Sequence, residues 1–121
     1  KKVLKYNSLP GTSRHHWGTD LDFISKRLAY WNSAQGKKTY SWLQTNAHKY
    51  GFFQPYGEGR SSGHSEEKWH WSYYPLSELY LAEYLKVITA SDLKGFKSDF
   101  SAEKFSVIRD YVQGIAAADN K

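Results

Sequence analysis

The stretch EKWHWSYYPL, residues 67–76, gives the clearest strand signal in this chain of 121 residues. From Trp69 onward aromatic side chains stand at alternating positions, a pattern typical of a strand with one face against a core. Pro75 fits the first turn of a helix, where its missing N–H removes no hydrogen bond. The amphipathic helix expected after it carries one apolar stripe: Leu76, Leu79, Tyr80, Tyr84, Val87 and Ile88.

A second strand is expected near the amino-terminal end, at TDLDFI, residues 19–24. Polar and apolar side chains alternate there, and alternation with period two is the mark of a strand. The pattern places two carboxylates on one face of this strand and two apolar side chains on the other. The acidic face carries Asp20 and Asp22, and the apolar face carries Leu21 and Phe23.

The segment between these two strands predicts a helix and one more strand. Residues 39–51 have a helical pattern, with Thr39 placed to cap the start and Gly51 placed to end it, after a loop over 32–38. FFQPY, residues 52–56, is the further strand. On the helix, three side chains are expected to share a face: Trp42, Ala47 and Tyr50.

A last helix is expected over about 101–113, and the whole order of elements then predicts the fold class. Strand, helix, strand, strand and two helices indicate an α+β fold, with a small antiparallel sheet flanked by helices. The length predicts a single domain, 1–121, able to bury roughly two-thirds of its unfolded surface. The apolar side chains expected to face inward from the last helix are Phe105, Ile108 and Val112.

Composition narrows the classes of partner. The chain has a net charge of +5, but its lysines are scattered and form no stripe, so a nucleic-acid partner is not expected. No run of 18 apolar residues is present, so no membrane span is expected. The chain has no cysteine, which excludes disulfides and thiolate metal sites. Any metal must be held by histidine and carboxylate, a ligand set that suits Zn²⁺.

Half of such a metal site is suggested by SRHHWGTDLD, residues 13–22. If the chain is extended on both sides of Gly18, His15 and Asp22 can point the same way, because a glycine allows the backbone to turn or bulge between them. An imidazole and a carboxylate on one face supply two of the three protein ligands of a catalytic zinc. The third ligand is expected to be another histidine.

His70 is the best candidate for that third ligand. Trp69 and Trp71 flank it, and neighbouring rings hold an imidazole rigid and exclude water. By contrast His48 falls within a helical pattern, and His64 falls in the glycine- and serine-rich loop 57–66. Another histidine, His16, is expected to point away from the site.

Glu67 stands three residues before His70. Metal-assisted hydrolysis needs a carboxylate beside the attacking water, to take its proton and pass it to the leaving amine. A regular strand would place residues 67 and 70 on opposite faces. We therefore expect Glu67 to lie at the end of the preceding loop, just before the strand begins.

These residues resemble a known pair of motifs. The pattern S-x-H-x-x-G-x-x-x-D, followed about 45 residues later by E-x-W-H, is similar to the paired signature of the VanY-type D-alanyl-D-alanine carboxypeptidases, zinc peptidases grouped with lysostaphin and the hedgehog N-terminal domain. The resemblance covers about residues 10–75. It implies that three side chains bind zinc. It also implies that a fourth side chain takes a proton from water and that a fifth lines the substrate pocket. The implied ligands are His15, Asp22 and His70, with Glu67 as the general base and Ser13 in the pocket.

Two departures from the family pattern bear on the site. The family commonly has alanine two positions before the aspartate, whereas this chain has Asp20, which is either a partner that supports a ligand or an alternative ligand. The family also carries an arginine some tens of residues before the first motif, thought to steady the developing oxyanion. Only twelve residues precede Ser13 here, and none is arginine. Arg14 alternates away from His15 and receives no role, while Trp69 is expected mainly to pack and to act on the site only indirectly, as a residue behind the ligands or beside the substrate.

The missing arginine leads us to expect the C-terminal part of a longer enzyme, or a trimmed one. KKVLKYNSLPG at the start has no apolar segment of a signal peptide. The resemblance implies a zinc D,D-carboxypeptidase acting on peptidoglycan stem peptides in a bacterial cell envelope, periplasmic or extracellular. Three alternatives stay open: a murein endopeptidase or dipeptidase, a zinc-bearing domain that binds wall peptides without turnover, and a metal-free binder of anionic polymers. The sequence does not indicate an oligomeric state.

Overall fold

The computed structural model describes residues 3–93 and 106–118. Its sheet has three short strands, β1 (Asp20–Asp22), β2 (Phe52–Phe53) and β3 (His70–Tyr73), in the order β1-β3-β2 with both pairings antiparallel. The predicted α+β class is therefore confirmed. All three expected strands are present, and the strand of the quoted stretch is the central one, so it alone pairs with both of the others.

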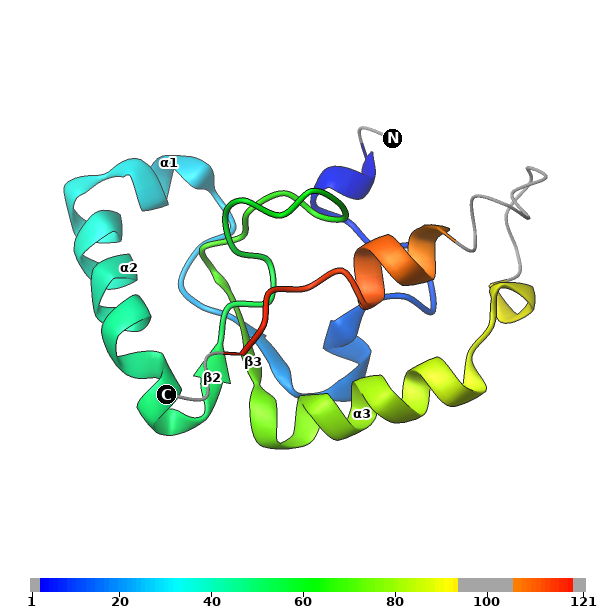
Figure 1. Ribbon diagram of the computed structural model, residues 1–121. Coiled ribbons are helices and arrows are strands. Elements are labelled where there is room, and N and C mark those ends of the chain that lie inside the picture. Colours follow the sequence, from blue (N-terminus) through cyan, green and yellow to red (C-terminus); the bar gives the residue numbers. More distant parts are fainter. Residues whose placement is uncertain (1–2, 94–105, 119–121) are drawn as a thin grey trace.

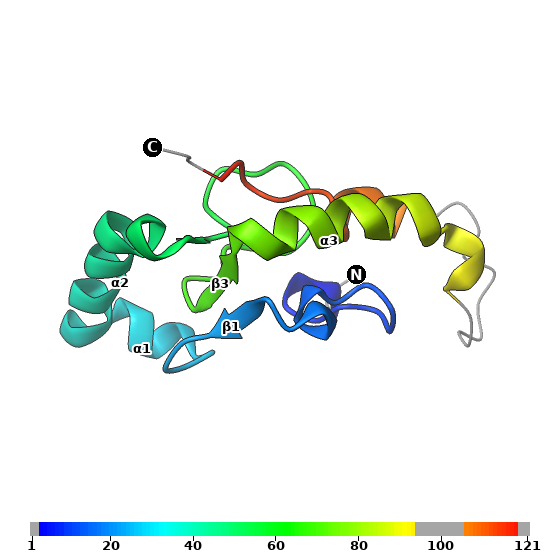
Figure 2. The ribbon, with the colours of Figure 1, turned by 90° about the horizontal axis from the view of Figure 1, so that it is seen from below.

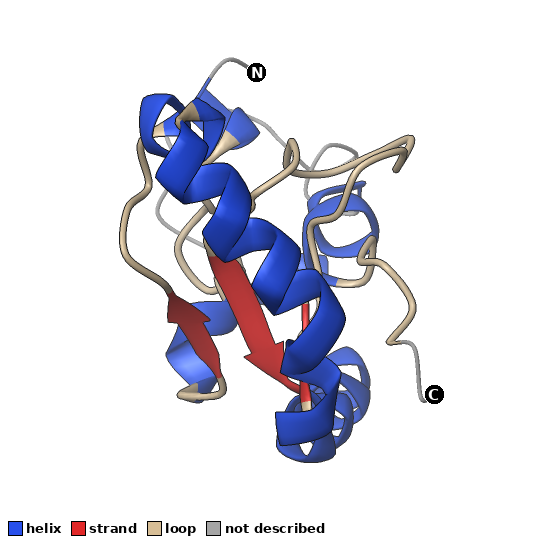
Figure 3. Cartoon of the chain, turned by 90° about the vertical axis from the view of Figure 1, so that its left-hand side faces the viewer, coloured by secondary structure: helices blue, strands red, loops and turns tan. Residues whose placement is uncertain are grey.

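Helices lie to either side of this sheet. α1 (Leu28–Asn32) and α2 (Ala34–Asn46) pack on each other on one side of it, and α3 (Tyr74–Val87) extends from β3 away from them (Figures 1 and 2). Figure 3, viewed from the side of α1 and α2, shows α2 running across the front of the short strands. Short turns complete the described chain: 3₁₀ turns at Val3–Lys5, Arg14–Trp17, Ala47–Tyr50 and Ala90–Asp92, and a π-helical turn at Ile108–Val112.

The core between the sheet and the first two helices is built from aromatic and aliphatic side chains. Trp69 and Trp71 of the quoted stretch both lie in it, 4% exposed each, as expected for alternating positions that share one face. Burial of such large rings is the main favourable term available to a small domain. The buried residues are Trp31, Leu43, Ala47, Trp69 and Trp71, with Phe23, Tyr30, Tyr40 and Phe52 packed against them.

The expected loop over 32–38 is wrong, because α2 already begins at Ala34. Ser33 caps this helix, its hydroxyl accepting a hydrogen bond from the Gly36 N–H at 3.1 Å. Gly36 is no loop glycine. A β-carbon there would lie 2.0 Å from the carbonyl oxygen of Tyr30, so glycine permits the close approach of α2 to α1.

The end of the predicted helix agrees with the structure better than its start. Gly51 has φ 81° and terminates the 3₁₀ turn that follows α2, as expected. Thr39 does not cap the helix, since it lies inside it and donates a hydrogen bond to the Gln35 carbonyl. Of the three side chains expected on one face, Ala47 is buried, whereas Trp42 and Tyr50 are exposed and stack on each other.

The stripe predicted on α3 is present but largely exposed. Leu76, Leu79, Tyr80 and Val87 are between 42% and 65% exposed. The buried Ser77 marks the face of α3 that packs on the rest of the molecule. Residues three or four positions apart lie on the same face of a helix. This face carries Ser77, Leu81 and Tyr84, and the Tyr84 ring contacts Trp17.

The last predicted helix falls partly outside the described residues, including its start and Phe105. Within them the chain is helical at 106–107 and continues as the π-helical turn. Val112 is fully buried and Ile108 is half-buried, so both face the protein as expected. No helix in the described ranges combines the length and the apolar character needed to cross a membrane.

Candidate metal centre

Pairing of β1 with β3 brings the two sequence motifs together. In this antiparallel register Asp22 lies opposite His70 and Asp20 opposite Ser72. Residues directly opposite each other, and those two positions away, share a face of a sheet. The acidic face of β1 therefore meets the imidazole of β3, while Leu21 lies opposite Trp71 on the other face and is 46% exposed.

His15 reaches the same place from a 3₁₀ turn and not from an extended segment, so the expectation of an extended chain on both sides of Gly18 is wrong. Ser13 caps the turn, its hydroxyl accepting a hydrogen bond from the His15 N–H at 3.3 Å. Gly18 ends the turn at φ 72°, a backbone conformation that favours glycine. The turn folds His15 back over the start of β1.

Three potential ligand atoms converge as a result. Asp22 Oδ1 lies 3.3 Å from His15 Nε2 and 3.8 Å from His70 Nδ1. All three atoms are within 4.8 Å of one another, and the two imidazole centroids are 4.5 Å apart. Ligand distances of 2.0–2.1 Å around tetrahedral zinc require separations of about 3.4 Å between ligand atoms. This His–Asp–His group can thus hold a metal ion with little movement.

The Asp22 carboxylate supports the fit. Its Oδ1 is buried and has no well-aligned hydrogen-bond partner among the described residues, so a lone pair is left open toward both imidazoles. Burial alone would raise the pKa of Asp22, but interactions with His15 and Lys26 lower it to about 2. The group is therefore a carboxylate at neutral pH, the form a metal requires.

Hydrogen bonds on the far side of each imidazole orient the two rings. His15 Nδ1 lies 3.2 Å from the backbone carbonyl oxygen of Asp20, and His70 Nε2 lies 2.6 Å from Asp20 Oδ2. When these atoms carry the protons, Nε2 of His15 and Nδ1 of His70 present lone pairs toward Asp22. Partners of this kind fix the tautomer and the direction of a metal-ligating histidine.

Asp20 lies behind His70 and not within the converging group. It is 5% exposed, and its oxygens accept hydrogen bonds from three side chains besides His70. Burial would raise the pKa of Asp20, but the His70 hydrogen bond and the charge of Arg14 hold that pKa below its ordinary value. The three further donors are Thr19 Oγ1 at 2.9 Å, Ser72 Oγ at 2.7 Å and Arg14 Nε at 3.1 Å.

Arg14 is the residue that sequence reasoning missed. It is only 1% exposed, forms a buried ion pair with Asp20, and lines the same pocket as His15. Its Nη2 donates to Ser72 Oγ at 3.0 Å, and its guanidinium lies 4.6 Å from the Trp17 ring. The available signal was Asp20, because a carboxylate on the buried face of a strand needs a cation beside it.

Glu67 lies just before β3, as expected, and is 5% exposed. Its Oε2 is 3.1 Å from His70 Nδ1, the imidazole nitrogen that faces Asp22. Its backbone N–H donates to the Tyr56 carbonyl, which anchors this turn. Burial would lower the pKa of His70, but hydrogen bonds with Asp20 and Glu67 raise it.

The space in front of the group is a polar pocket of about 160 Å³. The amino-terminal segment forms one wall, since Ser8 Oγ lies 3.1 Å from His64 Nε2. His64 is not in a loose loop as expected: it is 4% exposed, and its Nδ1 contacts the Leu4 carbonyl oxygen. Side chains lining the pocket beside the ligand group include Tyr6, Asn7, Ser13, Lys26, Tyr56 and Glu67.

The remaining histidines and Trp69 lie away from the group. His16 and His48 are exposed. Trp69 belongs to the core and does not line the pocket, so the structure places it as a packing residue. Of the sequence-predicted site residues, Ser13, His15, Asp22, Glu67 and His70 lie around one pocket, with Asp20 directly behind His70.

Comparison with known proteins agrees with this arrangement. A family model described as VanY, D-alanyl-D-alanine carboxypeptidase, matches residues 1–76. This chain belongs to the VanY family. The part matched to VanY contains the whole sheet and all the residues of the candidate centre, whereas most of α3 and residues 106–118 lie beyond it.

A curated relative agrees with the family model. A D-alanyl-D-alanine carboxypeptidase of Enterococcus faecalis (strain ATCC 700802 / V583) is 31% identical over 68 residues, which are 54% of this chain and 24% of the relative. The chain thus spans about a quarter of the length of this VanY-like relative. No solved structure matches the chain.

Proposed function

We propose that this chain is a zinc-dependent D,D-carboxypeptidase domain that removes the terminal D-alanine from peptidoglycan stem peptides. Membership of the VanY family supports the carboxypeptidase role. The observation that carries the proposal is the convergence of His15 Nε2, Asp22 Oδ1 and His70 Nδ1, with Glu67 beside them.

In this proposal His15, Asp22 and His70 hold Zn²⁺. When bound, the ion supplies Lewis-acid chemistry, activating water and polarising the scissile carbonyl. The chain's own contribution is a rigid frame for the three ligands. Asp20, held by Arg14 and Ser72, keeps His70 in one tautomer and one direction.

Glu67 acts as the general base and then as the general acid. Its carboxylate lies next to the proposed ligand atom of His70, within reach of a water molecule beside the metal position. It would accept a proton from that water as the water attacks the peptide carbonyl, and return it to the leaving amine. Burial of Glu67 limits competition from bulk solvent.

In this proposal the substrate binds in the pocket in front of the three ligands. Ser13 and the amino-terminal segment line it, and Lys26 supplies a positive charge at its edge. These groups suit a small, polar peptide end. We propose the bacterial cell envelope, periplasmic or extracellular, as the place of action, and residues 1–121 as one domain; no nucleic-acid partner is part of the proposal.

The experiment that tests the proposal is an assay of the zinc-loaded chain on a stem pentapeptide ending in D-Ala-D-Ala, measuring free D-alanine. Glu67→Gln should keep its zinc and lose hydrolysis by at least about 100-fold, since general base catalysis supplies about 10²–10⁴ in rate. Exposed Glu83→Gln, on α3, is the matched control and should keep full activity.

Other outcomes separate the alternatives. Cleavage of cross-linked peptides without release of free D-alanine would replace the proposal with an endopeptidase. Zinc and peptide binding without turnover would indicate a non-catalytic wall-binding domain. Loss of zinc in Glu67→Gln would show that this residue is a ligand and not the base.

A further inference from the structure

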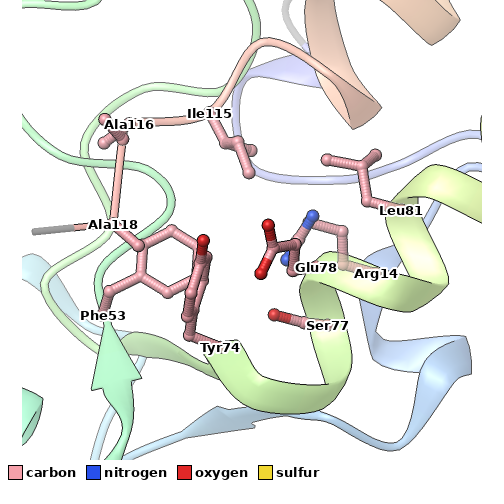
Figure 4. A pocket seen from close by; sticks show the side chains of 10 residues that line it. Arg14, Phe53, Tyr74, Ser77, Glu78, Leu81, Ile115, Ala116 and Ala118 are labelled. Carbon is pink, nitrogen blue, oxygen red and sulfur yellow. The ribbon is translucent and has the colours of Figure 1, made fainter. Parts of the chain in front are cut away.

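A second cavity lies on the other side of Arg14 from the metal centre. Its volume is about 290 Å³, near the lower end of the range for small-molecule sites, about 300–1,000 Å³. It lies between the first turns of α3, β2 and the segment 115–118 (Figure 4). Nothing in peptide hydrolysis at the metal centre uses this cavity.

Two polar atoms at the floor of the cavity lack partners. Arg14 Nη1 and Ser77 Oγ are buried and make no hydrogen bond within the described residues, although each residue is only 1% exposed. Both residues line this cavity, and Figure 4 shows the Ser77 hydroxyl directed into it. An unsatisfied buried polar group destabilises the folded chain, and more so when it is charged. Two such groups facing one space indicate a missing acceptor.

The rest of the lining consists of one acidic side chain and of apolar walls. Glu78 also lines the cavity, with its carboxylate directed into it in Figure 4, and it is an exposed residue at the rim. The walls are apolar. They come from Phe53 on β2, Leu81 on α3, and Ile115 and Ala116 of the carboxy-terminal segment.

We propose that this cavity binds a free α-amino acid with a short apolar side chain. Its carboxylate would accept hydrogen bonds from Arg14 Nη1 and Ser77 Oγ, and its ammonium group would pair with Glu78. Its side chain would contact Leu81 and the other apolar walls. A simple anion would be repelled by the Glu78 carboxylate and would leave that charge without a partner. An apolar ligand would leave Arg14 Nη1 and Ser77 Oγ without a hydrogen-bond acceptor. A small zwitterion satisfies all three groups.

The test is a titration of the full chain with L-alanine and D-alanine, followed by backbone amide shifts in NMR. Acetate and methylamine are the matched half-ligands. Saturable binding with shifts in α3 and residues 114–117 is expected for at least one alanine enantiomer, and much weaker binding for either half-ligand. Ser77→Ala should weaken binding about tenfold or more, because a hydrogen bond to a charged group is lost. Glu78→Gln should weaken alanine binding and leave acetate binding unchanged or improved.

Exposed Glu83→Gln serves as the control and should bind alanine normally. The proposal is overturned if neither enantiomer saturates, or if Ser77→Ala and Glu78→Gln both bind as well as the parent chain. Acetate binding as tightly as alanine would show a plain anion site instead. Shifts confined to the residues around His15 and His70 would place the amino acid at the metal centre. Binding is read without hydrolysis, so failure here leaves the proposed peptidase function untouched.

Discussion

Among single residues, Asp20 and Arg14 set the orientation of the candidate centre without belonging to the converging group. Arg14 holds Asp20, and Asp20 Oδ2 holds His70 Nε2 at 2.6 Å. Both charged side chains are almost fully buried, so each is stabilised by the other in place of water. Removing one partner of such a pair leaves an uncompensated charge in the interior.

We therefore predict two separable effects. Asp20→Asn should lower zinc affinity about 10–100-fold, the usual consequence of losing a partner that orients a ligating histidine. Arg14→Met should destabilise the metal-free chain by about 3–5 kcal/mol, because it removes the cation from the buried ion pair with Asp20. Zinc affinity is measured against a competing chelator and stability by urea unfolding. Exposed Arg27→Met is the control; equal effects of Arg14→Met and Arg27→Met would refute the role of Arg14.

Asp22 gives the metal-free chain a defined acid sensitivity. Its pKa falls from 3.8 to about 2 in the folded chain, so the unfolded chain binds the proton more readily. This stabilisation is fully present above pH 3.8 and is lost as the pH falls toward about 2. Asp22→Asn should show a shallower loss of unfolding free energy across that window, measured by urea titration. If the unfolding free energy of Asp22→Asn and of the parent chain fell equally with pH across that window, folding would not lower the pKa of Asp22.

At the scale of elements, Gly36 controls the packing of α2 on α1. A β-carbon there would lie 2.0 Å from the Tyr30 carbonyl oxygen. Gly36→Ala should therefore lower the free energy of unfolding by about 1–3 kcal/mol, the usual effect of overpacking, although alanine is the better helix former. Thermal unfolding measures it, with exposed Lys37→Ala as the control on the same helix. A stabilised Gly36→Ala chain would contradict the contact.

Elements were predictable from the sequence where the local pattern alone decides them. Local rules explain three features of the structure: the alternating side chains of β1 and β3, Pro75 at the start of α3, and Gly51 at the end of the 3₁₀ turn that follows α2. The start of α2 does not. Asparagine, serine and glycine at 32–36 favour a loop locally, but contact with Tyr30 makes the glycine a packing residue.

The candidate site shows the same division between local and distant information. Histidine and carboxylate types at fixed spacing indicated His15, Asp22, Glu67 and His70, and the register of β1 with β3 brings them together. The ion pair of Arg14 depends on which side of a 3₁₀ turn faces the sheet. That side is set by contacts distant in the sequence, such as the hydrogen bond from Arg14 Nη2 to Ser72 Oγ.

For the whole molecule, the centre ties the amino-terminal turn to the central strand, so binding of a metal ion there would stabilise the fold. A ligand present at 1,000 times its dissociation constant stabilises the folded state by about 4.1 kcal/mol. Zinc should therefore raise the melting temperature of the chain, and a chelator should reverse the change. His15→Ala should remove most of this response, and exposed His48→Ala should keep it. Differential scanning calorimetry checks the shift; an equal response of the two variants would argue against His15 as a ligand.

The convergence of residues from both motifs on one ion is tested most directly by an anomalous difference map, recorded at the zinc edge from a crystal of the zinc-loaded chain. We predict one strong peak about 2.0–2.1 Å from His15 Nε2, Asp22 Oδ1 and His70 Nδ1. A zinc-loaded crystal with no peak there, or with its peak on other side chains, would contradict the account.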